Sequence, residues 1–409
     1  MVCLPSLRIG EYPLVFLDTT YDIWFFSPKE KERRVHDYET IGGSQDDFIG
    51  YKSTASEIRQ RMFLAGYDEK SLEHDFNNTK QQWLDDIRES IGYYSYSYGK
   101  FKESISQTVD LISEAESYWK LIESSTFDDY KAVFYELIMF DGNKKRERTK
   151  NINPKLLEFI KEGIQEFVSD ESAGFSVFEF PCSQQESMAL LLLDLCEDDD
   201  LCTIDITQLV RDGWVDDDDN EVLKSTKFYQ NFTSSLNELH ALNKEQENPV
   251  LQRMLFSSVI TTMEAYLSDT MKRNVLNRDA IKRRFVKNSE SLKRAKNICL
   301  NDIFDELEKL DKKIINEIES ISYHNVEVVT GLYKNVLLCK FPEAKLAQLS
   351  KCVEIRHDIV HRNGITTNGS LISITIEDVQ DLIELAIYII GYIDKQILDK
   401  LLDTESEQN

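Results

Sequence analysis

The sequence lacks the cysteine patterns that mark disulfide-rich and zinc-binding proteins. Its seven cysteines are odd in number and scattered along 409 residues, and no Cys-x-x-Cys pair occurs among them. Neither a disulfide framework nor a structural zinc site is therefore predicted. The amino terminus also lacks the basic, apolar and small-residue order of a signal peptide. We expect a reduced, cytoplasmic protein.

Long apolar runs and nucleotide or metal signatures are missing too. The longest apolar run of the last predicted helix, Leu385–Ile393, is too short to cross a membrane. Gly42-Gly43-Ser44 lacks the Gly-Lys-Ser/Thr signature of a phosphate loop. The acidic run 216–219 lacks the glycine and glutamate of an EF-hand loop, and neither it nor 197–200 has a Toprim-type spacing. We expect solvated acidic loops, no metal site and no cofactor.

The composition is that of a folded protein with room for two or three domains, since 41% of the residues are hydrophobic. The N-terminal region reads as α+β. We expect its strands at residues 6–8, 14–17, 23–26, 175–180 and 202–206, and its helices at 54–65, at 186–196 and over most of 72–135. The rest reads as an all-α bundle, so the chain is predicted to be predominantly helical. We expect an α/β domain at 1–222, a helical connector at 223–244 and the bundle at 245–409.

The most informative stretch is a predicted helix from Glu343 to Asn363 that ends in an arginine and two histidines. Leu349, Val353 and Val360 fall on one apolar arc of this helix, and Arg356 falls inside the same arc. A guanidinium on an apolar face is costly unless it is paired or lines a cleft. Arginine suits a phosphate, and histidine moves protons near neutral pH. The stretch therefore indicates phosphodiester chemistry on RNA.

Two further helices flank this stretch. Asn248 can cap the first one, and Pro249 suits its first turn. Thr375 and Asp378 form a capping box for the second, which runs to about Leu402 and is apolar nearly all round. A helix of that kind is expected at the centre of a bundle.

Together these helices resemble the HEPN superfamily, whose ribonuclease members carry an Arg-x4–6-His motif. Here the motif is Arg356-His357-Asp358-Ile359-Val360-His361, and the resemblance covers about residues 245–402. The first half of the chain resembles a domain found before HEPN or Toprim catalytic modules, on the segments 7–12, 51–54, 66–67 and 204–214. That second resemblance implies sensing work without chemistry of its own.

The HEPN resemblance implies metal-independent cleavage of RNA, with tRNA as one candidate, by attack of the ribose 2′-hydroxyl. His361 would be the general base or acid, and Arg356 would stabilise charge on the phosphorane. His357 would orient the phosphate or support His361, and Asp358 would set a tautomer or hold an arginine. Because Arg356 and His361 are separated by roughly 140° around a straight helix, a homodimer of the HEPN domain is expected to build the cleft.

Charge distribution points to a nucleic-acid surface. The chain carries a net charge of −25, yet residues 272–296 hold ten basic and two acidic side chains. Binding through such a stretch should weaken steeply with salt. We expect RNA contacts from Lys272, Arg273, Arg278, Lys282, Arg283, Arg284 and Lys287, together with Arg362 and Asn363 beside the motif. The alternative is a solvated helix face that pairs with the acidic surface of the N-terminal domain of the same chain.

Other interpretations remain open at this point. The two histidines could be ordinary helix-end side chains and Arg356 a structural ion pair, which would leave a non-catalytic HEPN module that binds RNA or nucleotide or holds a dimer. The architecture also resembles antiviral effectors of bacteria, so a phage trigger or a separate nucleotidyltransferase antitoxin is a candidate partner.

Overall fold

The structure is a computed structural model that describes residues 6–15, 23–35, 47–100, 105–139, 152–167, 182–215, 224–245, 248–293 and 300–402. The chain divides into two compact units. The first comprises residues 1–63 and 67–220, and the second comprises residues 64–66 and 221–409. Among the described residues, no helix is long and apolar enough to span a membrane.

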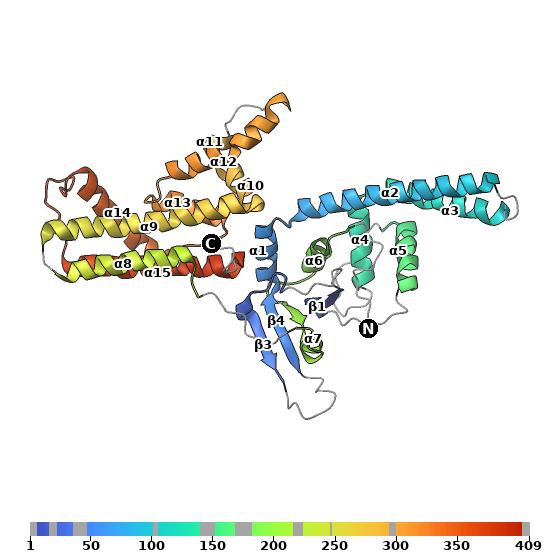
Figure 1. The fold of residues 1–409 in the computed structure, drawn as a ribbon, viewed down its shortest axis with the longest axis horizontal. Coiled ribbons are helices and arrows are strands. Elements are labelled where there is room, and N and C mark those ends of the chain that lie inside the picture. Colours follow the sequence, from blue (N-terminus) through green and yellow to red (C-terminus); the bar gives the residue numbers. More distant parts are fainter. Residues whose placement is uncertain are drawn as a thin grey trace. The chain divides into compact units, whose positions relative to one another are not determined.

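The first unit is built on a five-stranded antiparallel sheet of order β2-β1-β5-β4-β3. The strands are β1 (Ser6–Ile9), β2 (Tyr12–Val15), β3 (Lys31–Arg34), β4 (Phe48–Thr54) and β5 (Leu201–Asp205). β4 and β5 pair in the register Tyr51 with Ile204, and both of these side chains are buried. Figure 1 labels β1, β3 and β4 below helix α1. The expected strands at 6–8 and 202–206 are confirmed, and the one at 14–17 is confirmed in part.

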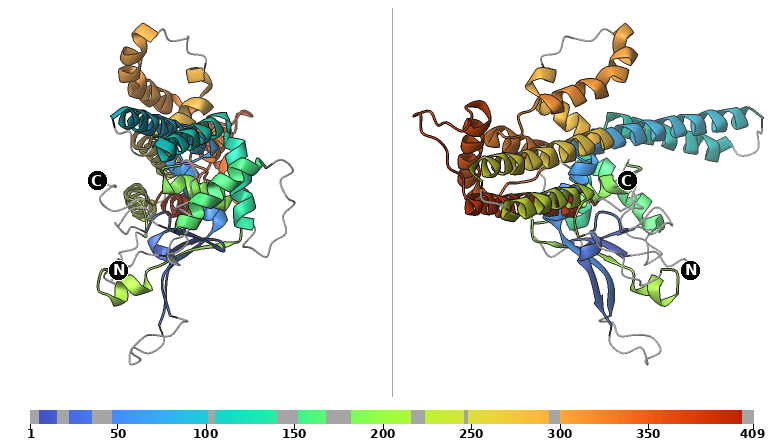
Figure 2. Two further views of the ribbon diagram at one scale, coloured as in Figure 1. Left: turned by 90° about the vertical axis from the view of Figure 1, so that its right-hand side faces the viewer. Right: turned by 60° about the vertical axis from the view of Figure 1, so that its left-hand side comes forward.

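Helices surround this sheet. They are α1 (Ala55–Ala65), α2 (Glu69–Lys100), α3 (Ile105–Ser124), α4 (Phe127–Met139), α5 (Pro154–Phe167), α6 (Gln185–Leu193) and α7 (Thr207–Arg211). α2 and α3 pack along each other as a long hairpin, which Figure 2 draws in blue and teal. α6 packs on β1 and β2, and its buried leucines join the core of Leu7, Ile9 and Ile58. The helices expected in this region are confirmed, and the strand expected at 175–180 lies outside the described residues.

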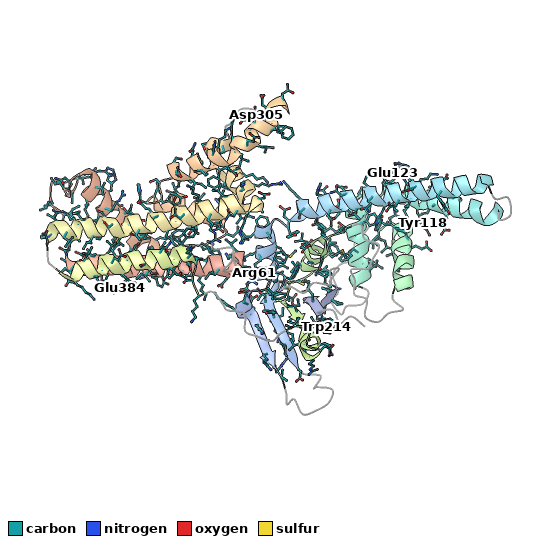
Figure 3. All side chains as sticks on the ribbon, viewed as in Figure 1. Arg61, Tyr118, Glu123, Trp214, Asp305 and Glu384 are labelled. Carbon is teal, nitrogen blue, oxygen red and sulfur yellow. The ribbon has the colours of Figure 1, made fainter. Side chains whose placement is uncertain are left out.

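The strand expected at 23–26 is wrong. Trp24 has a positive φ of 49°, so the chain turns there instead of extending. Arg61 of α1, labelled in Figure 3, donates to the carbonyl of Phe25 at 2.9 Å and pairs with Glu30 through both carboxylate oxygens. Ser27 and Glu30 then form a capping box that starts a short 3-10 helix, η1 (Pro28–Glu30). The apolar side chains of residues 23–26 therefore pack into the core from a turn, and hydrogen bonds from Arg61 stabilise this turn.

The second unit is entirely helical apart from an isolated bridge between Ile365 and Leu371, as far as the structure describes it. Its main helices are α8 (Lys227–Glu245), α9 (Pro249–Asn277), α10 (Asp279–Asn288), α11 (Glu290–Lys293), α12 (Ile303–Ser320), α13 (Val326–Val336), α14 (Glu343–His361) and α15 (Ile376–Leu401). α8, α9 and α15 pack side by side, as Figures 1 and 2 show. The predicted all-α character of this half is confirmed.

A buried carboxylate joins these three helices. Asp394 of α15 is 3% exposed and accepts hydrogen bonds from the Thr226 hydroxyl and backbone N–H and, at 2.9 Å, from the Tyr266 hydroxyl. Burial and this carboxylate raise the pKa of Tyr266 well above its usual value. A large apolar cluster and a few further buried polar side chains, such as Asn243 and Gln252, surround this network, so α9 gives α14 a well-packed surface.

Candidate functional site

Helix α14 carries the Arg-His motif and ends as its sequence dictates. It spans Glu343–His361, within two residues of the expected limits. Asn363 and Gly364 follow with positive φ of 52° and 78°, a conformation that these two residue types adopt readily. The carbonyl of Asp358 accepts from the N–H groups of Arg362 and Gly364, both at 3.1 Å. The motif therefore occupies the last two turns of a well-terminated helix.

The loop after α14 is fastened to α9. Gly364 accepts from Ile372 N–H at 2.8 Å, and Arg253 of α9 donates to the Ile372 carbonyl at 3.4 Å. A Cβ at Gly364 would lie 3.1 Å from Cδ of Arg253, so any larger residue requires the arginine side chain to shift by a few tenths of an ångström. The end of the motif helix thus has a defined position on the first turns of α9.

Arg356 lies on the packed face of α14, as the sequence predicts. Its side chain is 14% exposed, and Nη2 lies 3.6 Å from Oε1 of Glu264 on α9. Nε is buried and has no hydrogen-bond partner among the described residues. The guanidinium is therefore paired electrostatically and keeps donor capacity that no described group uses.

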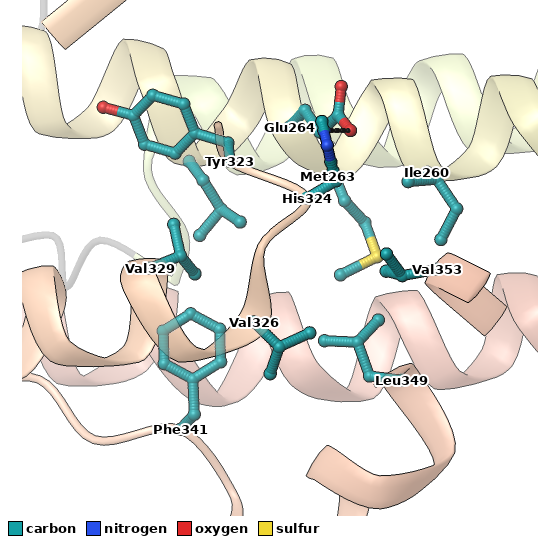
Figure 4. Close-up of a pocket in the computed structure, with 11 residues that line it drawn as sticks. Ile260, Met263, Glu264, Tyr323, His324, Val326, Val329, Phe341, Leu349 and Val353 are labelled. Atoms are coloured by element: carbon teal, nitrogen blue, oxygen red, sulfur yellow. Dashed lines mark ion pairs between the residues drawn. The ribbon is translucent and has the colours of Figure 1, made fainter. Parts of the chain in front are cut away.

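Glu264 has a second neighbour, His324, in the turn before α13. Nδ1 of His324 lies 3.1 Å from the same Oε1. Figure 4 shows Glu264 and His324 side by side among the residues that line a small hollow between α9, α13 and α14. The walls of this hollow are otherwise mostly apolar, with Ile260, Met263, Val326, Phe341, Leu349 and Val353 among them.

His357 and His361 lie on the exposed side of the same two turns. Their ring centroids are 4.7 Å apart with planes inclined by 45°, as expected for side chains four residues apart on a helix. Both residues are exposed. Within one chain the structure brings these histidines together, whereas Arg356 faces Glu264 instead.

Asp358 and Arg362 form a separate pair beside the histidines. Arg362 Nη1 donates to Asp358 Oδ1 at 2.6 Å, and the Arg362 side chain is 43% exposed. The same residues meet through the backbone at the helix end. Of the two expected roles for Asp358, the geometry agrees with holding an arginine. Asn363 is exposed at the helix end.

The basic residues expected to bind RNA lie further along α9 than the contacts of the motif helix. Arg356 meets α9 at Glu264, 8 residues or about 12 Å before Lys272, and Gly364 beyond His361 meets it at Arg253, 19 residues or about 28 Å before Lys272, at 1.5 Å per residue. In one chain, therefore, the structure does not bring this basic stretch to the histidines.

Many of these basic side chains are already engaged within the second unit. Lys272 pairs with Glu319 at 2.7 Å and Lys282 with Asp311 at 2.9 Å, both on α12. Arg278 and Arg284 donate to the carbonyls of Leu401 and Val336, and Arg273 lies over the ring of Phe228. Arg283 and Lys287 of α10 are exposed. Internal pairing thus accounts for much of the stretch, and its acidic partners lie on α12.

Two residues of the site were not anticipated from the sequence, namely Glu264 and His324. His324 is isolated in sequence, and only the fold places it beside α9. Glu264 did carry a signal, because it is the only acidic residue between Pro249 and Ser268. A lone carboxylate in one helix and a lone arginine in an apolar arc of another could have been matched as a buried pair.

The described residues contain no cluster of three or more histidine, cysteine, aspartate or glutamate side chains suited to a metal ion. In the acidic run 197–200, Asp198 pairs with Arg59 at 2.7 Å, and Asp200 caps the turn through the Glu197 N–H. The run 216–219 lies outside the described residues.

Fold and site together define a class: an α/β unit followed by a helical bundle whose motif helix ends in an Arg-x4-His sequence. The chain belongs to the HEPN/Toprim N-terminal domain 1 family, which it matches over residues 4–230. Residues 220–399 match the family described as RiboL-PSP-HEPN, so the expected HEPN resemblance is confirmed. HEPN domains of this kind are typically ribonucleases acting on RNA. No curated protein and no solved structure matched the chain.

Proposed function

We propose that this protein is a metal-independent endoribonuclease whose active site contains Arg356 and His361. The observation that carries the proposal is the burial and hydrogen bonding of these two side chains in the RiboL-PSP-HEPN domain. Arg356 is a largely buried cation with unused donor capacity, and His361 is an exposed imidazole five residues later on the same rigid helix. The guanidinium of Arg356 can bind a phosphate, and the imidazole of His361 can transfer a proton.

The reaction is a transesterification within the RNA. One imidazole removes the proton of the ribose 2′-hydroxyl, whose oxygen attacks the adjacent phosphorus. Arg356 stabilises the negative charge on the phosphorane oxygens. A second imidazole gives a proton to the departing 5′-oxygen, so the products are a 2′,3′-cyclic phosphate and a 5′-hydroxyl. His361 takes one of these roles and His361 of the partner subunit the other, while His357 orients the phosphate or supports His361.

The two-histidine scheme requires a homodimer, and the surface around the end of α14 suits one. Val360 lies on the same arc as Leu349 and Arg356, yet its side chain is 49% exposed. Other large apolar side chains exposed on the neighbouring turns are Val250, Met254, Ile365 and Leu371. Exposed apolar groups of this kind favour burial against a second copy.

The remaining parts of the proposal concern organisation and regulation. We assign residues 1–222 to sensing, 223–244 to a helical connector and 245–409 to catalysis. The family of the first half supports a regulatory role, and antiviral defence or toxin activity is the biological setting that we propose for a regulated ribonuclease. The trigger would be a phage component or the loss of an antitoxin.

One observation favours a second candidate, a HEPN module that binds RNA or dimerises without cleavage. Arg356 is already paired with Glu264, as a purely structural arginine would be. Purified wild type, His361→Ala and Arg356→Ala decide between the two when incubated with total RNA and tRNA in EDTA. Cyclic-phosphate fragments from wild type alone support the ribonuclease. Intact RNA with the isolated second unit as well as the full chain, together with retained RNA binding, supports the binding module.

A further inference from the structure

The carboxylate of Glu264 is shared by two side chains that come from different parts of the second unit. Arg356 approaches Oε1 from α14 at 3.6 Å, and His324 approaches it from the turn before α13 at 3.1 Å. Glu264 is itself 21% exposed and is among the residues that line the hollow. One oxygen atom therefore faces both an arginine and a histidine.

Neither contact is a locked hydrogen bond. Oε1 of Glu264 and Nε of Arg356 are both buried without a hydrogen-bond partner among the described residues. At 3.6 Å the Arg356–Glu264 contact exceeds normal N–H···O distances. The guanidinium is thus kept in place by charge, yet a phosphate oxygen can still compete for its donors.

His324 is oriented toward Glu264 by its own neighbour. Oγ of Ser322 lies 2.9 Å from Nε2 of the ring. The same hydroxyl lies 3.4 Å from Nδ1, so Ser322 helps to hold the ring in the position in which Nδ1 faces Glu264. The other ionisable groups nearest this turn are Tyr323, which is buried, and Asp269 of α9.

We propose that Glu264, with His324 behind it, is a positioning residue for Arg356. Glu264 holds the guanidinium beside α9 until an RNA phosphate binds. When the guanidinium then turns to the phosphate, His324 remains as the partner of the carboxylate. This inference rests on the proposed ribonuclease function and assigns no contact with RNA to Glu264 or His324.

The energetic reason is the cost of an unpaired buried charge. Removing one partner of a buried pair is strongly destabilising, because the other charge stays buried without compensation. If Glu264 had Arg356 as its sole partner, phosphate binding would carry that penalty. His324 beside the same oxygen reduces this penalty, so Arg356 is held in place and can still be released to the phosphate.

Steady-state kinetics of RNA cleavage test the role of the carboxylate. Glu264→Gln keeps the shape of the side chain and removes its charge. We expect kcat to fall at least tenfold while KM stays within threefold, because a misplaced guanidinium is felt in the transition state. Asp269→Asn removes a carboxylate from the same helix and should leave kcat within twofold. Equal kcat values for Glu264→Gln and wild type would overturn the proposal.

His324→Gln tests the second half on a partly exposed turn where folding is easily kept. We expect a 2′-deoxy RNA analogue, which binds without being cleaved, to bind three- to tenfold more weakly to this variant. In a Glu264→Gln background the same substitution should have no further effect, because there is no charge left to compensate. Independent, additive effects of the two substitutions would contradict the shared-carboxylate arrangement.

A chemical readout separates this proposal from the ribonuclease proposal. Labelling of Arg356 by phenylglyoxal, followed by peptide mass spectrometry, should become at least threefold faster in Glu264→Gln and remain unchanged in Asp269→Asn. That result with a wild-type protein that cleaves no RNA would leave the pair standing and overturn the proposed function. Unchanged labelling in a protein that does cleave RNA would overturn the positioning role alone.

Discussion

The rings of His357 and His361 lie one turn apart at the end of α14, with centroids 4.7 Å from each other. Both are exposed, while Arg356 beside them is largely buried against Glu264. The motif thus separates a fixed cation from two accessible imidazoles. In the proposed reaction the imidazoles move protons and the guanidinium stabilises charge.

The two histidines are expected to differ in importance. His361→Ala should lower the single-turnover cleavage rate by a factor of about 10² to 10⁴, the usual contribution of a general acid or base. His357→Ala removes only a supporting ring, so we expect a loss of about tenfold. His74→Ala, at an exposed histidine of α2 in the first unit, is the control. Larger losses in His357→Ala than in His361→Ala would reverse the assignment.

Gly364 should matter for more than its backbone angle. Gly364→Ala places a Cβ at positive φ and 3.1 Å from Cδ of Arg253, whereas Gly369→Ala meets only the positive φ with nothing within 4 Å. The left-handed conformation costs an L-residue about 1–2 kcal/mol. We expect both variants to lose stability in urea unfolding, and Gly364→Ala to lose clearly more and to cleave RNA more slowly. Equal losses would show that the Arg253 contact is unimportant.

RNA binding through the basic stretch should depend on the two exposed cations of α10. The double variant Arg283→Gln/Lys287→Gln should reduce the slope of log affinity against log salt by about 1.4, since each single-strand phosphate contact contributes about 0.7. Lys272→Gln/Lys282→Gln removes cations that already pair with Glu319 and Asp311 and should change the slope less. Filter binding between 50 and 300 mM salt, roughly, is the measurement. The opposite order would place the RNA on the paired residues.

Stability of the first unit should fall in acid because of Asp75. Burial raises the pKa of this carboxyl, but hydrogen bonds from Ser187, Ser183 and the Gln184 N–H outweigh burial and leave it lowered. A carboxyl whose pKa is lowered by folding stabilises the folded state at pH values above its unfolded-state pKa, which is near 3.9. This stabilisation disappears as the pH falls through the lower, folded-state pKa.

The corresponding measurement is urea unfolding of wild type and Asp75→Asn between neutral pH and about pH 3. Wild type should lose stability below about pH 4, and the variant should be less stable at neutral pH and less dependent on acid. Asp128→Asn, on α4 of the same unit, is the control. Parallel pH profiles for wild type and Asp75→Asn would exclude Asp75 as the cause of the loss of stability in acid.

Several elements of the second unit could be predicted because local signals and periodicity agree there. Asn248 caps α9, and the Thr375–Asp378 capping box starts α15, both as expected. The placement of Arg356 within an apolar arc followed from helical geometry alone. These features depend on residues within one or two turns of each other, which a sequence displays directly.

The failures arise where distant residues decide the local structure. β3 consists of Lys31-Glu32-Arg33-Arg34, an exposed edge strand without apolar alternation, so its pattern gave no strand signal. Residues 23–26 look like a strand and instead form a turn held by Arg61, 36 residues away. His324 and Glu264 meet only through tertiary packing. Contacts between residues of separate elements leave no local pattern in the sequence.

The central claim is that the 2′-hydroxyl of RNA is the nucleophile at the Arg356–His361 site. The most direct measurement is cleavage in EDTA of an RNA oligonucleotide with a mapped cleavage position, compared with the same oligonucleotide carrying a single 2′-deoxy substitution there. The account predicts a 2′,3′-cyclic phosphate end by mass spectrometry from the first, and no cleavage at that position in the second. Cleavage of the 2′-deoxy substrate at the same position, or a requirement for divalent metal, would contradict it.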